Sequence, residues 1–237
     1  MKLSVLMPAY NEERWIKRIV ERVIKQDVSG VDELEIVIVD DCSTDSTRKI
    51  ISELSASYPR TIKPVWHKKN SGKAESIKSA IKHMSGDICI IQDADLEYDP
   101  KDYPLLLEPI IEGRADCVYG SRFTGSQSKR VLFFWHYVGN KFLTLLSNMF
   151  TNLNLTDMET CYKAFRSEIL KSIPIQSRRF GLEPEITSRI AKKRCRVFEV
   201  GISYNGRTYE EGKKITWIDG IKAIFCIIWF NLTSPRE

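Results

Sequence analysis

Four carboxylates crowd one short stretch of the sequence, IIQDADLEYDP, directly after an apolar run. They stand at alternate positions with no basic residue among them: Asp93, Asp95, Glu97 and Asp99. If the chain turns there, Asp93 and Asp95 can face one hard cation such as Mg²⁺ or Mn²⁺, which takes oxygen ligands and shares its coordination with phosphates. The pattern therefore predicts a divalent metal site that works with a diphosphate. The competing interpretation is a solvated acidic loop that caps a helix after Pro100.

Two further polar segments could take part in the same chemistry. Asp40 and Asp41 end another apolar run, where a carboxylate either accepts hydrogen bonds from a ribose or a base edge, or caps a helix. In the segment NSGK, Gly72 permits close backbone approach and Lys73 offers a cation for a phosphate or a base. The segment lacks the full G-x-x-x-x-G-K-[ST] pattern, so it is not a P-loop.

The elements that must position these groups alternate between short β-rich runs and longer runs of helical period. Strands are predicted at Leu3–Pro8, Leu34–Asp40, Thr61–His67, Asp87–Asp93 and Ala115–Ser121. Helices are predicted at Glu12–Gln26, Asp45–Tyr58, Gly72–Met84 and Pro100–Gly113. Such alternation predicts an α/β fold, with a Rossmann-like, mostly parallel central sheet flanked by helices. Ligands of open α/β sheets bind at the carboxyl ends of the strands, and the acidic segments fall there.

The pattern changes after Phe123. The segment Val131–Phe150 is apolar and helical but interrupted by polar residues, and a helical Leu182–Lys193 precedes a strand-like Cys195–Tyr204. From Ile215 the tail carries apolar residues at helical spacing with lysines around them: Trp217, Ile218, Ile221, Ile224, Phe225, Ile228, Trp229 and Leu232. We expect an amphipathic C-terminal helix, which either packs on the core or lies on a membrane surface.

Composition narrows the class of protein. A chain of 237 residues with 43% apolar side chains suits one α/β domain, and a formal net charge of +5 suits an anionic partner. The basic residues are scattered, so a nucleic-acid partner is not expected. Six widely spaced cysteines indicate neither a disulfide framework nor a zinc site. No signal peptide and no run of about 18 apolar residues is found, so we expect a cytoplasmic chain that does not span a membrane.

The motifs together resemble those of family 2 glycosyltransferases with the GT-A fold. PAYNE, DDCSTDST, NSGK, QDADLE and GSRF occur in the family's order, each after a predicted strand. The later segments TDMETCYKAFR, EPEI and GRTYEEGKKITW resemble the polyprenyl-phosphate hexosyltransferase branch, which includes the dolichyl-phosphate mannose synthases. The resemblance covers essentially the whole chain. It implies one GT-A domain, with a nucleotide-sugar half at residues 1–122, an acceptor half at 123–214 and the amphipathic helix at 215–237.

The resemblance also assigns roles to individual residues. The implied nucleotide-sugar pocket consists of Pro8, Tyr10, Glu12, Asp40, Asp41, Lys73, Asp93, Ala94 and Asp95. The implied metal ligands are Asp93, Asp95 and Glu97. The implied catalytic residues are Asp95, Arg122 on the acceptor phosphate, and Arg207 with Lys213 as a clamp on the donor and acceptor phosphates. Cys42 departs from the family, which often has Gly there, and this narrows the backbone freedom of that turn.

The implied reaction is the inverting, Mg²⁺- or Mn²⁺-dependent transfer of a hexose from GDP-mannose or UDP-glucose to a polyprenyl (dolichyl) phosphate, on the cytoplasmic face of a membrane. An ionised phosphate acceptor needs no strong general base. The alternative is a sugar hydroxyl acceptor, which would need Glu183 or Glu185 as a base. Both glutamates could instead simply open a helix. A nucleotidyltransferase should carry a Gly-rich loop where this chain has PAYNE, and a non-catalytic sugar-nucleotide binder would bind donor without turnover.

Overall fold

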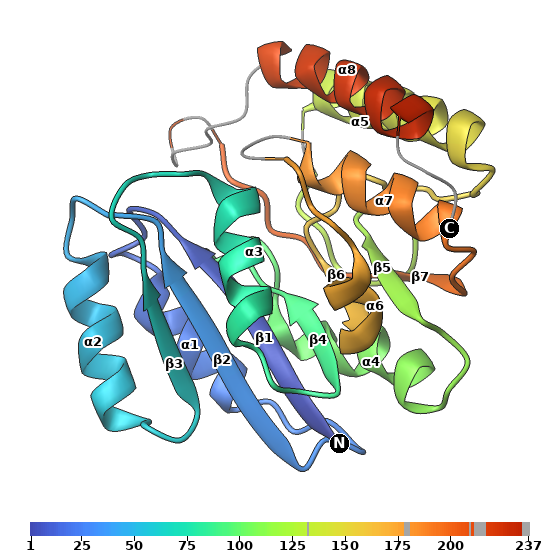
Figure 1. Cartoon of the computed structure of the whole chain (residues 1–237). Helices are drawn as coiled ribbons and strands as arrows, with labels where there is room; N and C mark the ends of the chain where they lie inside the picture. Colours follow the sequence, from blue (N-terminus) through green and yellow to red (C-terminus); the bar gives the residue numbers. More distant parts are fainter. Residues whose placement is uncertain (132, 178–180, 209, 211–216, 234–237) are drawn as a thin grey trace.

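A seven-stranded sheet runs through the computed structural model, which describes the chain except for residues 132, 178–180, 209, 211–216 and 234–237 (Figure 1). The strands follow the order β3-β2-β1-β4-β6-β5-β7. Their bounds are β1 Lys2–Ala9, β2 Glu33–Asp40, β3 Ile62–Trp66, β4 Ile88–Ile91, β5 Cys117–Ser121, β6 Lys163–Arg166 and β7 Val197–Gly201. The predicted mostly parallel sheet is confirmed, because β1 pairs in parallel with both β2 and β4, β2 with β3, and β5 with β7.

One strand breaks the parallel order. β6 lies between β4 and β5 and runs antiparallel to both. The sequence did not reveal it, since KAFR is short and begins with a lysine, and the pattern there predicted no element. The sheet is therefore continuous from residues of the first half of the chain to residues of the second. The division after residue 122 falls one residue beyond the end of β5 and stays a prediction.

Helices cover both faces of the sheet (Figure 1). Their bounds are α1 Ile16–Ile24, α2 Thr47–Ser57, α3 Lys73–His83, η1 Pro100–Asp102 (a 3₁₀ turn), α4 Tyr103–Ile111, α5 Phe134–Thr151, α6 Ser167–Ser172, α7 Leu182–Lys192 and α8 Trp217–Thr233. One core cluster joins the sheet to α1, α2 and α4, and the other joins it to α3, α6, α7 and α8. The predicted helices are confirmed. The first begins at Ile16 rather than Glu12: Asn11 has a left-handed backbone with φ of 54°, and a turn follows it in which the N–H of Trp15 donates to the carbonyl of Glu12 at 2.9 Å.

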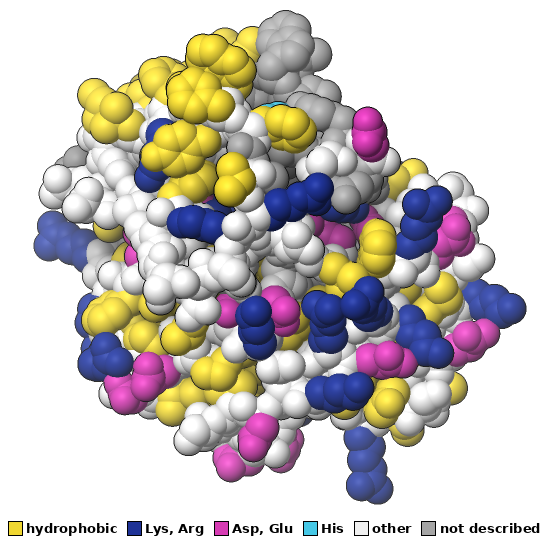
Figure 2. Space-filling model, turned by 180° about the vertical axis from the view of Figure 1, so that it is seen from behind, with side chains coloured by type: hydrophobic (Ala, Val, Ile, Leu, Met, Phe, Trp, Pro, Cys, Tyr) yellow, Lys and Arg dark blue, Asp and Glu magenta, His cyan; other side chains and the backbone are white. Residues whose placement is uncertain are grey.

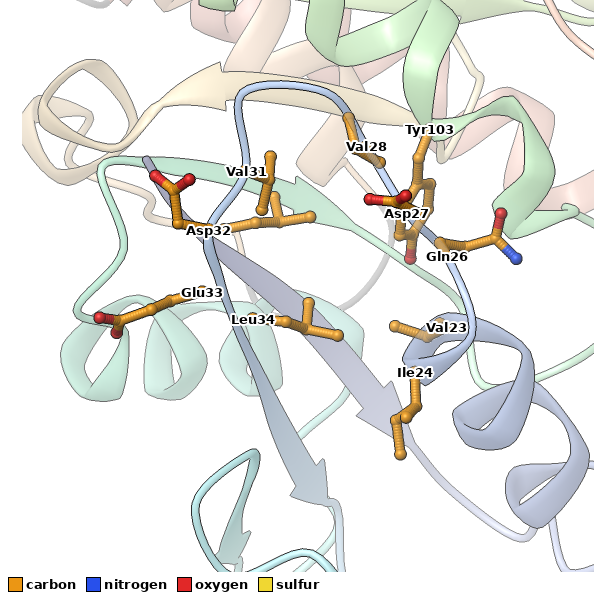
Figure 3. A pocket seen from close by; sticks show the side chains of 11 residues that line it. Val23, Ile24, Gln26, Asp27, Val28, Val31, Asp32, Glu33, Leu34 and Tyr103 are labelled. Atoms are coloured by element: carbon orange, nitrogen blue, oxygen red, sulfur yellow. The ribbon is translucent and has the colours of Figure 1, made fainter.

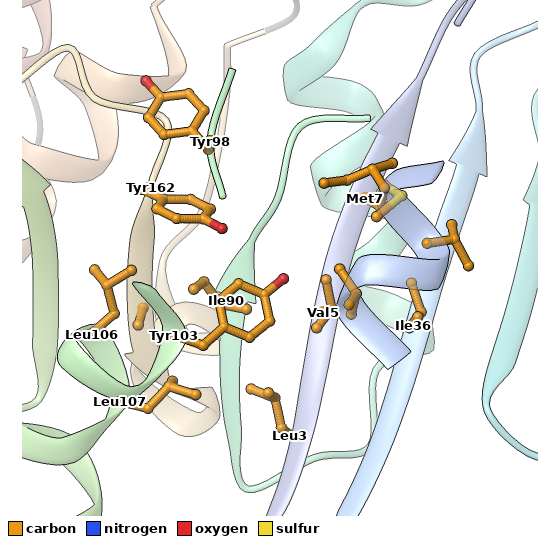
Figure 4. Packing of buried hydrophobic residues seen from close by; sticks show 14 of the residues in the cluster. Leu3, Val5, Met7, Ile36, Ile90, Tyr98, Tyr103, Leu106, Leu107 and Tyr162 are labelled. Carbon is orange, nitrogen blue, oxygen red and sulfur yellow. The ribbon is translucent and has the colours of Figure 1, made fainter. Parts of the chain in front are cut away.

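The central strands form because both of their faces are buried. Along β1, Val5 and Met7 belong to the first cluster while Leu6 between them belongs to the second. This alternation follows from the two-residue period of a strand. Figure 4 shows part of the first cluster, in which Val5 and Met7 lie across from Tyr103, Leu106 and Leu107 of α4. Each fully buried aliphatic side chain of this kind stabilises the fold by roughly 1.5–3 kcal/mol.

α5 and α8 form an outer layer over α7 (Figure 1). The two buried side chains of α5 are Thr144 and Ser147, whereas Trp135 is 78% exposed. The polar face of α5 binds the segment before β6. Thr144 Oγ1 accepts from the backbone N–H of Met158 at 3.1 Å, and Asn148 Nδ2 donates to the carbonyl of Leu155 at 2.8 Å. The helix is thus amphipathic in the inverse sense, with its apolar side outward.

α8 buries part of its apolar stripe and exposes the rest, and its contact with a membrane stays a prediction. Ala223, Ile227 and Phe230 are buried against the body, so part of the stripe packs on the core. Other apolar side chains of α8 and α5 remain exposed: Ile221, Phe225, Trp229, Leu232, Phe134, Val138, Phe142, Leu145 and Met149. Figure 2 shows hydrophobic side chains gathered at this end of the molecule, with Lys and Arg side chains next to them. We call these exposed residues, with Trp135, the apolar face. No described helix is both long and apolar enough to cross a membrane.

Candidate active site

The acidic loop after β4 meets two other segments at one arginine. Arg207 Nη2 lies 2.5 Å from Asp95 Oδ2, its Nε lies 2.8 Å from Glu97 Oε1, and its Nη1 lies 3.9 Å from Glu12 Oε2. Glu12 follows β1, and Asp95 and Glu97 follow β4. These two strands are neighbours in the sheet, so their carboxyl ends lie together, and Arg207 from the C-terminal part joins them. Burial alone would lower the pKa of Arg207, but Asp95 and Glu97 raise it well above its usual range.

Lys73, at the start of α3, neutralises the other aspartate of the loop. Its Nζ lies 2.7 Å from Asp93 Oδ1, 3.6 Å from Glu183 Oε1 and 2.9 Å from Cys161 Sγ. Burial on its own would lower the pKa of Lys73, but Asp93, Cys161 and Glu183 outweigh it and hold that pKa well above its ordinary value. A charged ammonium group thus stands beside the predicted diphosphate position.

Asp95 carries the electrostatic signature of a cation site. Burial raises its pKa, the neighbouring charges of Asp93 and Glu97 raise it further, and Arg207 only partly compensates, so the pKa reaches about 7. A divalent cation between Asp93 and Asp95 would relieve this repulsion. Within the described ranges no three His, Cys, Asp or Glu side chains gather as a metal cage. Two carboxylates fit Mg²⁺ or Mn²⁺, since these ions usually take the remaining ligands from water and substrate phosphates.

The predicted third ligand, Glu97, has protein partners in the structure. Its Oε1 accepts from Arg207, and its Oε2 accepts from the hydroxyl of Tyr204 at 2.8 Å. Glu97 therefore anchors Arg207 beside the aspartates. Its coordination to a metal stays a prediction, and a metal would have to compete with both of these hydrogen bonds.

Two acids lie at the end of β2, and Asp41 supports the segment directly before Lys73. Asp41 accepts hydrogen bonds from the backbone N–H groups of Ser71 and Gly72, and its Oδ1 lies 2.7 Å from His67 Nδ1. Asp40 is fully buried, and its Oδ2 lies 2.8 Å from Arg48 Nε. The sequence missed His67 and Arg48 as partners. The position of His67 directly after β3, at the same sheet edge, was the available signal.

Two turns at this edge need unusual backbone conformations. Gly72, directly before α3, has φ of 92°, a region that glycine enters without steric penalty. Cys42, where the family often has glycine, keeps a left-handed backbone with φ of 61°. The turn after β2 is therefore compatible with a cysteine, at a strain of about 1–3 kcal/mol for a non-glycine residue.

The rest of the predicted nucleotide pocket lies at the same sheet edge. Pro8, one residue before the end of β1, pairs with Val39 of β2, and Tyr10 just beyond the strand is partly exposed. Ala94 is buried between the two aspartates of the loop. Lys213 lies outside the described residues.

Arg122, predicted to hold the acceptor phosphate, is already paired. Its Nε and Nη2 lie 2.7 and 2.8 Å from the two carboxylate oxygens of Asp157, and its guanidinium stacks over the ring of Tyr204 at 5.3 Å. Burial alone would lower its pKa, but Asp157 keeps it well above the usual range. Asn140 of α5 accepts a further bond from Nη2, so Nη1 is the nitrogen left without a partner in the described part of the chain. Asp157 was not singled out in the sequence, although TDMET contains it.

The structure separates the two glutamates of the EPEI segment. Glu185 is fully buried and its carboxylate accepts from the backbone N–H groups of Gln176 and Ser177 and from Arg189, 2.9 Å away. Its oxygens are saturated and closed off from solvent, so in this arrangement none of them is offered to a substrate hydroxyl. Glu183 remains partly exposed and faces Lys73.

A separate hollow of about 150 Å³ opens at the other end of the sheet, between the end of α1 and the start of β2 (Figure 3). Val23, Leu34 and Tyr103 are among its lining residues. It lies at the amino ends of the strands, away from the edge where α/β sheets bind ligands. We assign it no part in the site.

Fold and site together define an α/β protein in which acidic and basic side chains from distant segments converge at the carboxyl edge of a mostly parallel sheet. Residues 4–173 match the glycosyl transferase family 2 model, and the chain belongs to this family. The predicted family is thereby confirmed.

Similar sequences point in the same direction. The chain is 29% identical over 215 residues to a dolichol-phosphate mannosyltransferase of Pyrococcus furiosus, an alignment that covers 90% of this chain and 59% of that protein. It is 24% identical over 246 residues to a UDP-N-acetylglucosamine–dolichyl-phosphate N-acetylglucosaminyltransferase of Methanococcus voltae, covering 97% and 96% of the two chains. The chain thus spans less than two thirds of the first of these relatives.

Among solved structures, glucosyl-3-phosphoglycerate synthase from Mycobacterium tuberculosis in complex with Mn²⁺, UDP and glucosyl-3-phosphoglycerate superposes with a TM-score of 0.73 at 19% identity, over 99% of this chain and 81% of that one. A mannosyltransferase from Pyrobaculum calidifontis in complex with GDP-mannose and Mn²⁺ gives a TM-score of 0.63 at 20% identity, over 89% and 58%. At this identity the similarity shows the fold, and the predicted fold class is confirmed.

Proposed function

We propose that the chain transfers a hexose from a nucleotide sugar to a polyprenyl phosphate at a membrane surface. The observation that carries the proposal is the pairing of the two loop aspartates with two cations from distant segments, Asp93 with Lys73 and Asp95 with Arg207. Such a set of charges suits a diphosphate bound with a divalent ion. The names of the two relatives specify dolichol phosphate and dolichyl phosphate, and this supports the choice of acceptor.

The donor site follows from the charges. Asp93 and Asp95 would hold Mg²⁺ or Mn²⁺, which when bound supplies Lewis-acid stabilisation to the departing diphosphate. Lys73 and Arg207 stand beside the aspartates and stabilise the same developing negative charge. Asp41 fixes the backbone before Lys73, so the ammonium group is positioned before substrate arrives. GDP-mannose and UDP-glucose are both proposed as donors.

The acceptor phosphate would bind the free edge of Arg122. Its pairing with Asp157 fixes the guanidinium plane and leaves Nη1 for a phosphate oxygen. That oxygen forms the new bond to the anomeric carbon from the face opposite the diphosphate. The bond from the anomeric carbon to the diphosphate breaks, and its electron pair stays on the diphosphate oxygen. No proton has to be removed, and the configuration at the anomeric carbon inverts.

The apolar face suits a lipid-linked acceptor. α5 carries Trp135 and Phe142 outward while its polar side binds the segment that contains Asp157. A membrane that receives these side chains would therefore bring lipid headgroups close to Arg122, which contacts Asn140 of α5. Tryptophans beside lysines and arginines are typical of helices at the bilayer interface. We propose peripheral binding to the cytoplasmic face of a membrane.

One observation favours a second candidate, transfer to a sugar hydroxyl. Glu183 is partly exposed beside the donor site and could accept a proton from a hydroxyl. The two candidates differ in their need for this carboxylate. Radiolabelled hexose from GDP-mannose or UDP-glucose, supplied with Mn²⁺, should appear on dolichyl or undecaprenyl phosphate with the purified chain. Label that appears on a glycan and not on a polyprenyl phosphate would refute the leading proposal.

A further inference from the structure

Glu159 carries a buried oxygen that the fold leaves without a partner. The residue precedes β6, and its Oε1 is closed off from solvent yet accepts no hydrogen bond from the described residues. No described Lys or Arg forms an ion pair with it, because nearby Lys163 donates to the carbonyls of Met158 and Thr160 instead. An unsatisfied buried acceptor destabilises a protein, so such a group is expected where a ligand completes it.

The place of Glu159 connects the two substrate sites. Glu159 lies two residues after Asp157, which pairs with Arg122 on the acceptor side, and two residues before Cys161, whose Sγ lies 2.9 Å from Lys73 Nζ on the donor side. A sugar in transfer has to lie between the donor diphosphate and the acceptor phosphate. The segment that carries Glu159 therefore runs from the acceptor side to the donor side, where Glu183 lies 3.6 Å from Lys73.

We propose that Glu159 and Glu183 form the subsite that recognises the hydroxyl groups of the transferred sugar and selects neutral sugars over anionic ones. This inference rests on the proposed function. Carboxyl oxygens accept hydrogen bonds from sugar hydroxyls, and a hydroxyl on Glu159 Oε1 would satisfy the orphaned acceptor. A sugar that carries a carboxylate of its own would bring a further negative charge next to these carboxyl groups and would be repelled.

The protonation of Glu159 agrees with this role. Burial raises its pKa, the charge of Glu183 raises it further, and the pKa reaches about 7 although Lys163 and Arg122 act in the opposite direction. Near neutral pH the Glu159 carboxyl can therefore carry a proton, and a protonated carboxyl both donates and accepts. A sugar hydroxyl also both donates and accepts hydrogen bonds, so it can pair with such a carboxyl group.

Calorimetric titration with Mn²⁺ tests the subsite. The ligands are UDP, UDP-glucose and UDP-glucuronate, with GDP and GDP-mannose as a second pair, and the proteins are wild type, Glu159→Gln and Glu183→Gln. Glu53→Gln, on the exposed surface of α2, is the matched control. Wild type and the control should bind UDP-glucose or GDP-mannose more tightly than the bare nucleotide, and UDP-glucuronate at least about tenfold more weakly than UDP-glucose.

In both site variants the affinity for the hexose conjugate should fall by about tenfold, with the affinity for the bare nucleotide unchanged and the discrimination against UDP-glucuronate reduced. Thermal unfolding identifies a variant that has lost its fold, and Glu183→Gln, which changes a partly exposed side chain, then decides the test. Wild-type binding of all ligands by a folded Glu183→Gln overturns the inference and leaves the proposed function standing. A wild type that binds no nucleotide sugar overturns both.

Discussion

Replacing Glu185 by glutamine should destabilise the protein without removing its chemistry. The carboxylate is fully buried and accepts from the backbone N–H of Gln176, the backbone N–H and hydroxyl of Ser177, and the guanidinium of Arg189. Glutamine keeps one acceptor oxygen but turns an amide donor toward groups that also donate. It therefore leaves Arg189 as a buried, unpaired charge.

The magnitude follows from that change. Breaking a buried ion pair from one side costs roughly 3–5 kcal/mol, and the retained oxygen favours the lower end, about 3 kcal/mol. For a chain of this size the melting temperature should fall by about 6–12 °C. Glu183→Gln is the neighbouring contrast, because Glu183 lies 3.6 Å from Lys73 at a partly exposed position. Its melting temperature should fall less, since glutamine keeps an acceptor oxygen toward Lys73 and the ammonium group stays paired with Asp93.

Circular dichroism melts measure the stability of both variants, and hexose transfer at a temperature where both are folded measures their activity. Folded Glu185→Gln should turn over close to the wild-type rate. An additional Arg189→Leu change should be less destabilising in Glu185→Gln than in wild type, since the pair is already broken. A Glu185→Gln protein with the wild-type melting temperature and no transfer would refute the structural role given to this residue.

Three further changes test other parts of the molecule. Asp95→Asn should abolish transfer and metal-dependent donor binding with the fold retained, as followed by titration with Mn²⁺ and circular dichroism; normal turnover would remove the metal assignment. Burial would raise the pKa of Glu35, but bonds from Lys63, Ser4 and Ser85 lower it from 4.5 to about 2, so its stabilisation is full above pH 4.5 and is lost as the pH falls toward 2. Acid unfolding should therefore show a loss on the order of 2–3 kcal/mol in wild type that Glu35→Gln lacks. Changing Phe225 and Trp229 together to serine should weaken flotation with anionic liposomes by tenfold or more, given about 1.5–3 kcal/mol for each large apolar side chain; unchanged flotation would exclude α8 from membrane binding.

The sequence alone determined the plan of the sheet and the edge at which its acidic residues lie. Apolar runs alternate with helical periods, and a parallel sheet brings every strand's carboxyl end to the same edge, so the pattern of residues suffices to place Asp40, Asp93 and Asp95 together. Lys73 was predicted on the same grounds. These features depend on local periodicity and chain direction, both of which are written in neighbouring residues.

Only the tertiary structure decided which strands pair with β6 and which side chains form ion pairs in the site. β6 is antiparallel and pairs with residues of β5 that lie more than 40 positions earlier in the chain. The four residues KAFR do not indicate this pairing. Arg122 meets Asp157, and Arg207 meets Asp95, over sequence separations of 35 and 112 residues. The tertiary structure also decided the orientation of α5. Its polar side binds the segment before β6, and this turns its apolar side outward. A sequence specifies which side chains can pair, but burial and distance select which of them do, because both arise only when distant segments pack together.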